Sequence, residues 1–195
     1  MKQIVLATNN RNKFNEMVEA LGRTGIHFSP AWSYPGAPEV AEDGESLEDN
    51  SLKKARALCE FTNLPALSDD TGLFVDALQG RPGIFAARYA GENCTYEDNV
   101  RKMLLELSGV PWEKRMALFR TIITIYYPDG HYDQVAGEVF GKITLVPKGE
   151  KGFGYDPIFL PAGQERVFAE LTLEEKNRIS HRGKALRAAC SLLNS

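Results

Sequence analysis

The sequence predicts an α/β fold, a single domain over residues 1–195 with a mixed β-sheet and flanking helices. Three observations support this prediction. Short apolar runs, which are typical of buried strands, alternate with segments whose apolar residues recur at i, i+3, i+4 and i+7, the spacing of a helix face. Capping residues mark the starts of several helices. Two β-rich segments joined by a turn indicate an antiparallel hairpin, so the sheet is expected to be mixed.

The elements are predicted in order along the chain. Residues 4–7 form a short buried strand, and Thr8–Lys13 (TNNRNK) is the polar loop that follows it. Helical spacing of apolar residues makes 14–21 a helix, and Gly22 offers its stop. The later elements are a Pro- and Gly-containing connection at 29–44, a helix at 46–63 that starts from a capping box, a strand at 73–78, a helix capped by Thr95, strands at 115–127 and 131–145, a helix capped by Thr172 and a last helix from Ser180.

The composition is that of an ordinary globular protein, with 43% hydrophobic and 25% charged residues and a net charge of −3. Neither this charge nor the pI of about 5.7 favours a nucleic-acid polymer as partner, so any anion site must be built locally. The apolar runs are too short for a membrane span. Cys59, Cys94 and Cys190 lie far apart without a C-x-x-C motif, which argues against a zinc site or a disulfide framework. A reducing cytoplasm is the expected location.

The loop Thr8–Lys13 is a candidate phosphate site. A polar loop between a strand and a helix presents free backbone N–H groups, and its side chains here add donors and positive charge. The alternative is a polar N-cap of the following helix, a position where Asn is common. The candidate residues are Thr8, Asn9, Asn10, Arg11, Asn12 and Lys13.

Three carboxylates, Glu42, Asp69 and Asp70, fall near the ends of predicted elements. Mg²⁺ prefers carboxylate oxygens and is often held by one or two of them together with substrate phosphates. The alternative for Glu42 is a solvated turn. For the Asp69–Asp70 pair that alternative is weaker, because apolar segments precede and follow it and buried like charges need a neutralising partner.

The segment KGFGYDPIF, residues 151–159, is a candidate base-contacting loop. Gly152 and Gly154 let the backbone approach a ligand closely. Phe153 and Tyr155 have aromatic faces on which a base can stack. A Gly-rich turn whose aromatic rings point into the core is an equally open alternative.

The segment Lys176–Arg187 has five Lys and Arg residues and no acid, a local positive patch in an acidic chain. His181 and Arg182 fall in the first turn of the predicted last helix, where cations oppose the helix dipole. Arg provides planar, directional donors that suit a base carbonyl or a phosphate. For Lys184 and Arg187 a solvated basic face is the alternative.

Taken together, the motifs LATNNRNK, LSDDTGLFVDALQGRPGIFAARYAG, GFGYDPIF and ELTLEEKNRISHRGKAL resemble those of the inosine triphosphate pyrophosphatase family in nearly end-to-end order. The resemblance implies an elongated mixed sheet with flanking helices, two lobes around a central cleft, and a homodimer. It also implies Mg²⁺-dependent cleavage of non-standard purine nucleoside triphosphates (ITP, dITP, XTP) to the monophosphate and pyrophosphate.

The resemblance assigns roles to individual residues. Asp70 matches the metal-binding and catalytic aspartate, Glu42 a second metal carboxylate, and Lys54 a lysine that reaches phosphate. Asn9 and Lys151 stand where many members have Gly, and Thr71 replaces a frequent Ser with its hydroxyl kept. The residues expected to hold the substrate are Thr8–Lys13 for phosphates, Thr71 beside them, and Phe153, Gly154, Tyr155, Asp156, Lys176, His181 and Arg182 for the base and sugar.

The implied mechanism is attack of a positioned water on the α-phosphorus while lysines and the metal neutralise the leaving pyrophosphate. Donors from His181 and Arg182 would pair with the oxo group of a 6-oxo purine. They would exclude adenine, because its amino group is itself a donor. The rival functions are a pyrophosphatase for modified pyrimidines, a general triphosphate phosphatase, and a nucleotide-binding regulatory module without turnover.

The adjacent acids Asp69 and Asp70 are expected to have different roles. Consecutive side chains of an extended segment point to opposite faces. Asp70 should therefore face the site, while Asp69 turns to a backbone amide or a basic neighbour. Thr71-Gly72 is expected to bend the chain after them.

Overall fold

The computed structural model describes residues 3–22 and 25–193 and confirms the α/β class. Helices and strands are mixed along the chain, as the sequence predicts. The strands are β1 (Gln3–Leu6), β2 (His27–Pro30), β3 (Ala66–Val75), β4 (Pro82–Gly83), β5 (Met116–Tyr126), β6 (Tyr132–Ile143) and β7 (Phe159–Pro161). The helices are α1 (Arg11–Leu21), α2 (Leu47–Thr62), α3 (Tyr96–Glu106), α4 (Leu173–Ile179) and α5 (His181–Leu193).

The sheet is mixed, as expected. Its strand order is β2-β1-β3-β5-β6-β7, with β4 paired to β3. Strand β1 runs parallel to both β2 and β3, whereas β4 pairs antiparallel with β3 and β7 antiparallel with β6. The register of the β1–β3 pair sets Leu6 opposite Leu67, and Ala7 N donates to Leu67 O at 2.7 Å. The loop after β1 therefore starts beside the acidic stretch of β3.

The described residues belong to two compact units. Unit 1 is formed by the chain up to Asp70, by Thr121–Gly137 and by the segment from Ser180 onward; unit 2 is formed by Thr71–Arg120 and Glu138–Ile179. The division falls inside β3, β5 and β6.

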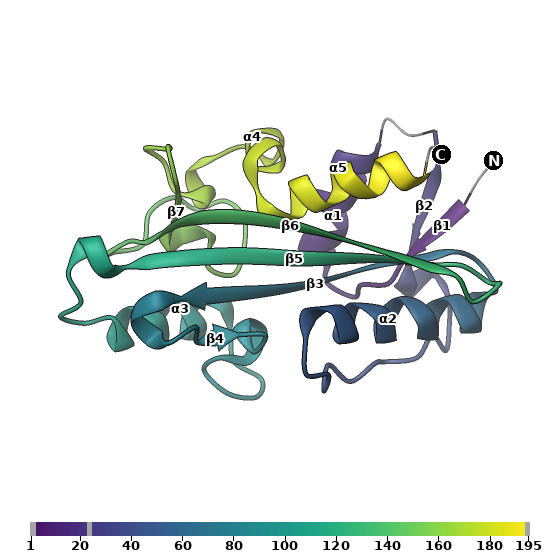
Figure 1. Cartoon of the computed structure of the whole chain (residues 1–195), viewed down its shortest axis with the longest axis horizontal. Coiled ribbons are helices and arrows are strands. Elements are labelled where there is room, and N and C mark those ends of the chain that lie inside the picture. Colours follow the sequence, from purple (N-terminus) through teal and green to yellow (C-terminus); the bar gives the residue numbers. More distant parts are fainter. Residues whose placement is uncertain (1–2, 23–24, 194–195) are drawn as a thin grey trace. The chain divides into compact units, whose positions relative to one another are not determined.

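Unit 1 is a sheet layer covered by helices on both faces. Helices α1 and α5 pack on one face, where Leu6, Met17 and Leu186 share an apolar cluster. Helix α2 covers the other face, where Val5 and Leu58 belong to a separate cluster. Neighbouring residues of β1 thus enter opposite clusters, as the pleat of a strand requires. Figure 1 shows α2 on one side of the strands and α1 with α5 on the other.

Unit 2 has one apolar cluster that joins α3 to β5, β6 and β7. Phe119, Phe159 and Phe168 form its aromatic centre, with ring centroids of Phe119 and Phe159 4.6 Å apart. Met103 from α3 is fully buried in the same cluster. This core supports the turn that carries Phe153 and the short helix α4.

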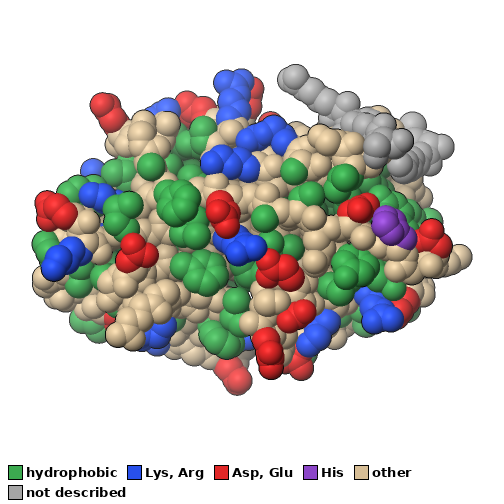
Figure 2. Space-filling model, viewed as in Figure 1, with side chains coloured by type: hydrophobic (Ala, Val, Ile, Leu, Met, Phe, Trp, Pro, Cys, Tyr) green, Lys and Arg blue, Asp and Glu red, His purple; other side chains and the backbone are tan. Residues whose placement is uncertain are grey.

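The surface carries both signs of charge. On the face drawn in Figure 2, acidic and basic side chains are interspersed among scattered hydrophobic ones. Within residues 3–22 and 25–193, no helix combines the length and the apolar character that crossing a membrane requires.

The predicted helix starts are confirmed at the level of individual hydrogen bonds. Ser46 Oγ accepts from Asp49 N at 3.1 Å at the start of α2, and Thr95 forms a reciprocal capping box at the start of α3. Thr172 and Glu175 bond each other's backbone N–H groups at the start of α4. The predicted hairpin is also present, as β5 and β6.

Three local predictions are wrong. Helix α1 begins at Arg11, so half of the expected loop is helical, because Asn10 caps the free N–H groups there. Residues 71–72 do not bend the chain, because β3 continues to Val75 and residues 76–78 form a 3₁₀ turn instead of strand. Strand β2 lies partly within the segment expected to be a connection, since parallel pairing with β1 satisfies its backbone.

Candidate active site

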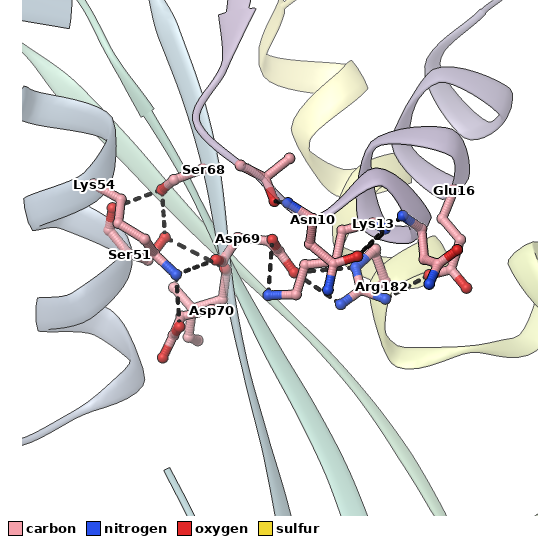
Figure 3. Close-up of polar contacts among 12 residues, drawn as sticks. Asn10, Lys13, Glu16, Ser51, Lys54, Ser68, Asp69, Asp70 and Arg182 are labelled. Carbon is pink, nitrogen blue, oxygen red and sulfur yellow. Dashed lines mark hydrogen bonds and ion pairs between the residues drawn. The ribbon is translucent and has the colours of Figure 1, made fainter. Parts of the chain in front are cut away.

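Three consecutive polar residues of strand β3 point alternately to the two faces of the sheet in unit 1. Ser68 and Asp70 point toward α2, whereas Asp69 points toward α1 and α5 (Figure 3). All three are buried, Asp69 to 1% and Asp70 to 4% exposure. The prediction that the two aspartates face opposite ways is confirmed.

Asp69 is held by two cations. Lys13 Nζ lies 3.2 Å from its Oδ1, and Arg182 donates to its Oδ2 from Nε at 3.0 Å and from Nη2 at 2.8 Å. Burial alone would raise the pKa of Asp69, but Lys13 and Arg182 outweigh it and hold the pKa well below its usual range. The expected basic neighbour of Asp69 is therefore confirmed.

Arg182 is buried between two carboxylates. Its Nη1 donates to Glu16 Oε2 at 2.5 Å, and its side chain is 2% exposed. Burial would lower the pKa of this guanidinium, but Asp69 and Glu16 raise it. The structure thus places Arg182 in an ion-pair network of its own unit; the predicted contact with a base stays a prediction.

Lys54 lies on the other face and bridges three acceptors. Its ammonium donates at 2.7 Å to Glu42 Oε1, to Asp70 Oδ1 and to the backbone oxygen of Asp69. An ammonium has three N–H donors, so these contacts use all of them. Burial would lower the pKa of Lys54, but Asp70, Asp69 and Glu42 together raise it. Lys54 is therefore a fixed positive charge.

The two carboxylates around Lys54 differ in basicity. Burial raises the pKa of Asp70 above its usual value, and the Glu42 charge adds to this, so the neighbouring lysines only offset part of the shift. Burial acts on Glu42 in the same direction, but Lys54 outweighs it and the pKa of Glu42 lies below its usual range. The pKa values of the two carboxylates are thus shifted in opposite directions from their usual values.

The ion-pair network of unit 1 carries an excess of negative charge. Among the described residues, its cations are Lys13, Lys54 and Arg182, and they are shared by Glu16, Glu42, Asp69 and Asp70. Lys13 and Arg182 pair with Asp69, whereas Lys54 pairs with both Glu42 and Asp70. The excess negative charge lies at the Glu42–Asp70 end.

The loop before α1 is a capped helix N-terminus. Asn10 Oδ1 accepts from Asn12 N at 3.0 Å and from Lys13 N at 3.2 Å, and Asn10 N donates to Thr8 Oγ1 at 3.2 Å. The alternative assignment of Asn10 as an N-cap is therefore confirmed. Asn9, Arg11 and Asn12 are exposed, and the predicted phosphate contact of this loop stays a prediction.

The start of α5 packs closely on β6. A Cβ at Gly137 would lie 2.1 Å from the backbone oxygen of His181 and 2.4 Å from Ala185 N, so only glycine allows this approach. His181 is buried at the first position of the helix. The packing fixes the direction from which Arg182 reaches Asp69.

Unit 2 holds the second group of predicted residues. Asp156 Oδ2 accepts from Lys176 Nζ at 2.5 Å and from Phe153 N at 2.8 Å. The Lys176 ammonium lies 4.8 Å from the centroid of the Phe153 ring, a cation–π contact. Gly152 has φ +75°, and a Cβ there would lie 2.1 Å from the same Asp156 oxygen. The turn is therefore built around the Asp156 carboxylate.

The two aromatic residues of this turn have different environments. Tyr155 is buried, and this burial raises the pKa of its phenol. Its hydroxyl donates to Ala86 O at 2.8 Å. Its ring belongs to the core of unit 2, as the alternative for this segment anticipated. Phe153 is half-buried and borders a cavity of about 640 Å³ together with Tyr96 and Gly154. Thr71, the remaining predicted residue, is half-buried in β3.

Sequence reasoning missed several residues that hold this arrangement. Glu16 lies three residues after Lys13 on α1, so helix periodicity could have indicated that both lie on one helix face. Ser68 lies two residues before Asp70 and therefore shares its face of β3. Ser51 and Thr124 had no local signal, because their contacts join α2 and β5 across long sequence separations.

The fold and site define a class of α/β proteins in which a mixed sheet carries a carboxylate–lysine cluster beside a capped helix N-terminus. The chain belongs to the Ham1 family, whose model matches residues 4–192. A dITP/XTP pyrophosphatase of Desulforamulus reducens is 47% identical over 192 residues, 98% of this chain and 96% of the relative. One of Bacillus subtilis is 40% identical over 195 residues, 100% of this chain and 98% of the relative. The solved structure of a HAM1 protein from Coxiella burnetii matches with a TM-score of 0.89 at 39% identity and covers 99% of this chain and 98% of that chain.

Proposed function

We propose that this chain hydrolyses non-standard purine nucleoside triphosphates, namely ITP, dITP and XTP, to the nucleoside monophosphate and pyrophosphate. The observation that carries the proposal is the buried Lys54 ammonium held between Asp70 and Glu42, close to the capped start of α1. Such a cluster can neutralise phosphate charge and hold a water molecule at once. The names of the relatives from Desulforamulus reducens and Bacillus subtilis supply the substrate class.

The site fits one Mg²⁺ ion bound together with substrate. Glu42 and Asp70 carry the excess negative charge of the network, and a hard cation prefers such oxygens. Within the described residues, no group of three or more His, Cys, Asp or Glu side chains is placed to hold a metal by itself. The other ligands would then be substrate phosphates and water, a usual arrangement for Mg²⁺. When bound, the ion supplies charge neutralisation at the phosphates.

The residues of unit 1 then have separate tasks. The N-terminus of α1 provides a favourable helix dipole for a phosphate, while the N–H groups of Asn12 and Lys13 are taken by the Asn10 cap. Lys54, whose pKa is raised, stays protonated and neutralises charge on the departing pyrophosphate. Asp70 orients the attacking water, because its Oδ1 is fixed by Lys54. Asp69, whose pKa is held low, is an anchor for Lys13 and Arg182.

Base recognition belongs to other residues. Phe153 has a half-buried ring at the edge of the cavity in unit 2, and stacking on it adds affinity for any purine. Discrimination requires a donor to the 6-oxo group, because adenine presents a donor in its place. His181 and Arg182 are the donors proposed from the sequence.

The test is a nucleotide panel with product analysis. The purified protein is incubated with ITP, dITP, XTP, ATP and GTP, and phosphate is measured with and without added inorganic pyrophosphatase. Signal that appears only with pyrophosphatase, and mainly for ITP, dITP and XTP, supports the proposal. Equal turnover of all five nucleotides contradicts the proposed substrate specificity. Direct release of orthophosphate indicates a phosphatase instead.

Three finer points belong to the same proposal: a Mg²⁺ requirement, a homodimer and a cytoplasmic location. Chelation with EDTA should abolish turnover and added Mg²⁺ should restore it. Light scattering after size exclusion should give the mass of two chains. Activity that resists the chelator would contradict the Mg²⁺ requirement, and a monomeric mass would contradict the homodimer.

A further inference from the structure

A row of hydrogen-bonded, buried hydroxyl groups lies beside the Lys54–Asp70 pair in unit 1. It joins Thr124 of β5, Ser51 of α2 and Ser68 of β3, all three at 0% exposure. Thr124 Oγ1 donates to Ser51 Oγ at 2.8 Å, and the two serine oxygens are also 2.8 Å apart. Figure 3 shows Ser51 and Ser68 facing one another beside Lys54. The tasks proposed above do not use these groups.

The hydrogen bonds among these hydroxyl groups run in one direction. Each hydroxyl has a single proton to donate. Ser68 uses its proton on the backbone oxygen of Ser51 at 2.6 Å, so Ser51 is the donor in the 2.8 Å bond between the two serines, and its other acceptor, Ile122 O, is farther away at 3.4 Å. Thr124 donates to Ser51 and accepts from Gln134 Nε2 at 2.9 Å. Every hydroxyl therefore both donates and accepts, which buried polar groups require.

The positions of these residues link them to the proposed catalytic pair. Ser51 precedes Lys54 by three residues on α2, so both lie on the same helix face. Ser68 precedes Asp70 by two residues on β3, so both lie on the same strand face. The bonds between the two serines thus tie the helix face that carries the ammonium to the strand face that carries the carboxylate.

We propose that Thr124, Ser51 and Ser68 are positioning residues that hold Lys54 and Asp70 in the geometry needed for turnover. The inference rests on the proposed function, because it assigns the effect to the chemical step. Displacements of about 1 Å in a catalytic group can cost up to about 10²-fold in rate. The network restricts such displacement without touching substrate.

Thr124 offers a pair of variants that separates positioning from stability. Thr124→Val keeps the shape of the side chain and removes the hydroxyl. Thr124→Ser keeps the hydroxyl and removes a buried methyl group. Ser29→Ala is a matched control, because Ser29 is also buried and its Oγ lies 2.8 Å from the Tyr34 hydroxyl, in a separate hydrogen bond on β2.

The readouts are kcat and KM for ITP, with the thermal unfolding midpoint measured in parallel. Thr124→Val should lower kcat about tenfold and change KM by less than about twofold. Thr124→Ser should unfold at a lower temperature yet retain kcat, and Ser29→Ala should retain kcat. Wild-type kcat in Thr124→Val, or an equal loss of kcat in Thr124→Ser, overturns the inference.

A crystal structure of Thr124→Val makes the test independent of turnover. The inference predicts that the contact between Lys54 Nζ and Asp70 Oδ1, 2.7 Å in the native chain, lengthens or is lost. An unchanged contact overturns it even if activity falls. A wild-type protein that is inactive on every nucleotide refutes the proposed function instead, and the crystal structure then still decides the positioning role.

Discussion

Replacing each of the adjacent aspartates by asparagine should separate stability from catalysis. Asp69→Asn removes the charge that pairs with Lys13 and Arg182, and it leaves Arg182, 2% exposed, without one of its two buried carboxylate partners. Breaking a buried ion pair by removing one partner costs about 3–5 kcal/mol. In a chain of this size that lowers the unfolding midpoint by roughly 6–20 °C.

Asp70→Asn should behave differently. The pKa of Asp70 is raised, so folding disfavours its charged form, and an uncharged amide of the same shape is expected to cost less stability than at position 69. Turnover should nevertheless be abolished. The assay is calorimetry of both variants with ITP hydrolysis measured alongside. Equal midpoints for the two variants, or full activity in Asp70→Asn, would refute the reasoning.

Three further predictions concern other parts of the chain. Lys54→Met should reduce kcat on the order of 10²–10³-fold, as loss of a charge-stabilising donor does, and a rate within a factor of two of wild type would exclude that role. Phe153→Ala should raise KM about tenfold for ITP and ATP alike through lost stacking, so a changed ratio between them would contradict a purely stacking role. The Arg166 guanidinium, with the Thr172 N–H, lowers the pKa of Glu175 to about 2 from 4.5, so this carboxylate stabilises the folded state above pH 4.5 and loses that contribution as the pH falls toward 2. Glu175→Gln should therefore unfold at a lower temperature than wild type near neutral pH, with the difference shrinking in acid; a difference independent of pH would contradict the assignment.

Local chemistry made much of the fold predictable. Ser46, Thr95 and Thr172 accept hydrogen bonds at helix starts for reasons contained in a few neighbouring residues, and the structure confirms them. Strand β2 and the straight course of β3 past Asp70 were not predictable in this way. They depend on which strands pair, since β2 lies along β1 and β3 pairs with the short strand β4.

The site, too, has features that local sequence predicts and features that depend on packing. The opposite orientation of Asp69 and Asp70 follows from strand geometry alone, and the structure confirms it. The burial of Arg182 between Asp69 and Glu16 was not predictable, since it depends on how α1 and α5 pack together. A motif can name the residues of such a network, but only the packed structure shows which partners neutralise each charge.

The proposed reaction is attack of water on the α-phosphorus at the Lys54–Asp70 cluster. The most direct measurement is ITP hydrolysis by the wild-type protein in water enriched in oxygen-18, with mass spectrometry of both products. Attack at the α-phosphorus predicts that the heavy oxygen appears in the nucleoside monophosphate and that the pyrophosphate is unlabelled. Label in pyrophosphate, or release of labelled orthophosphate, would contradict it.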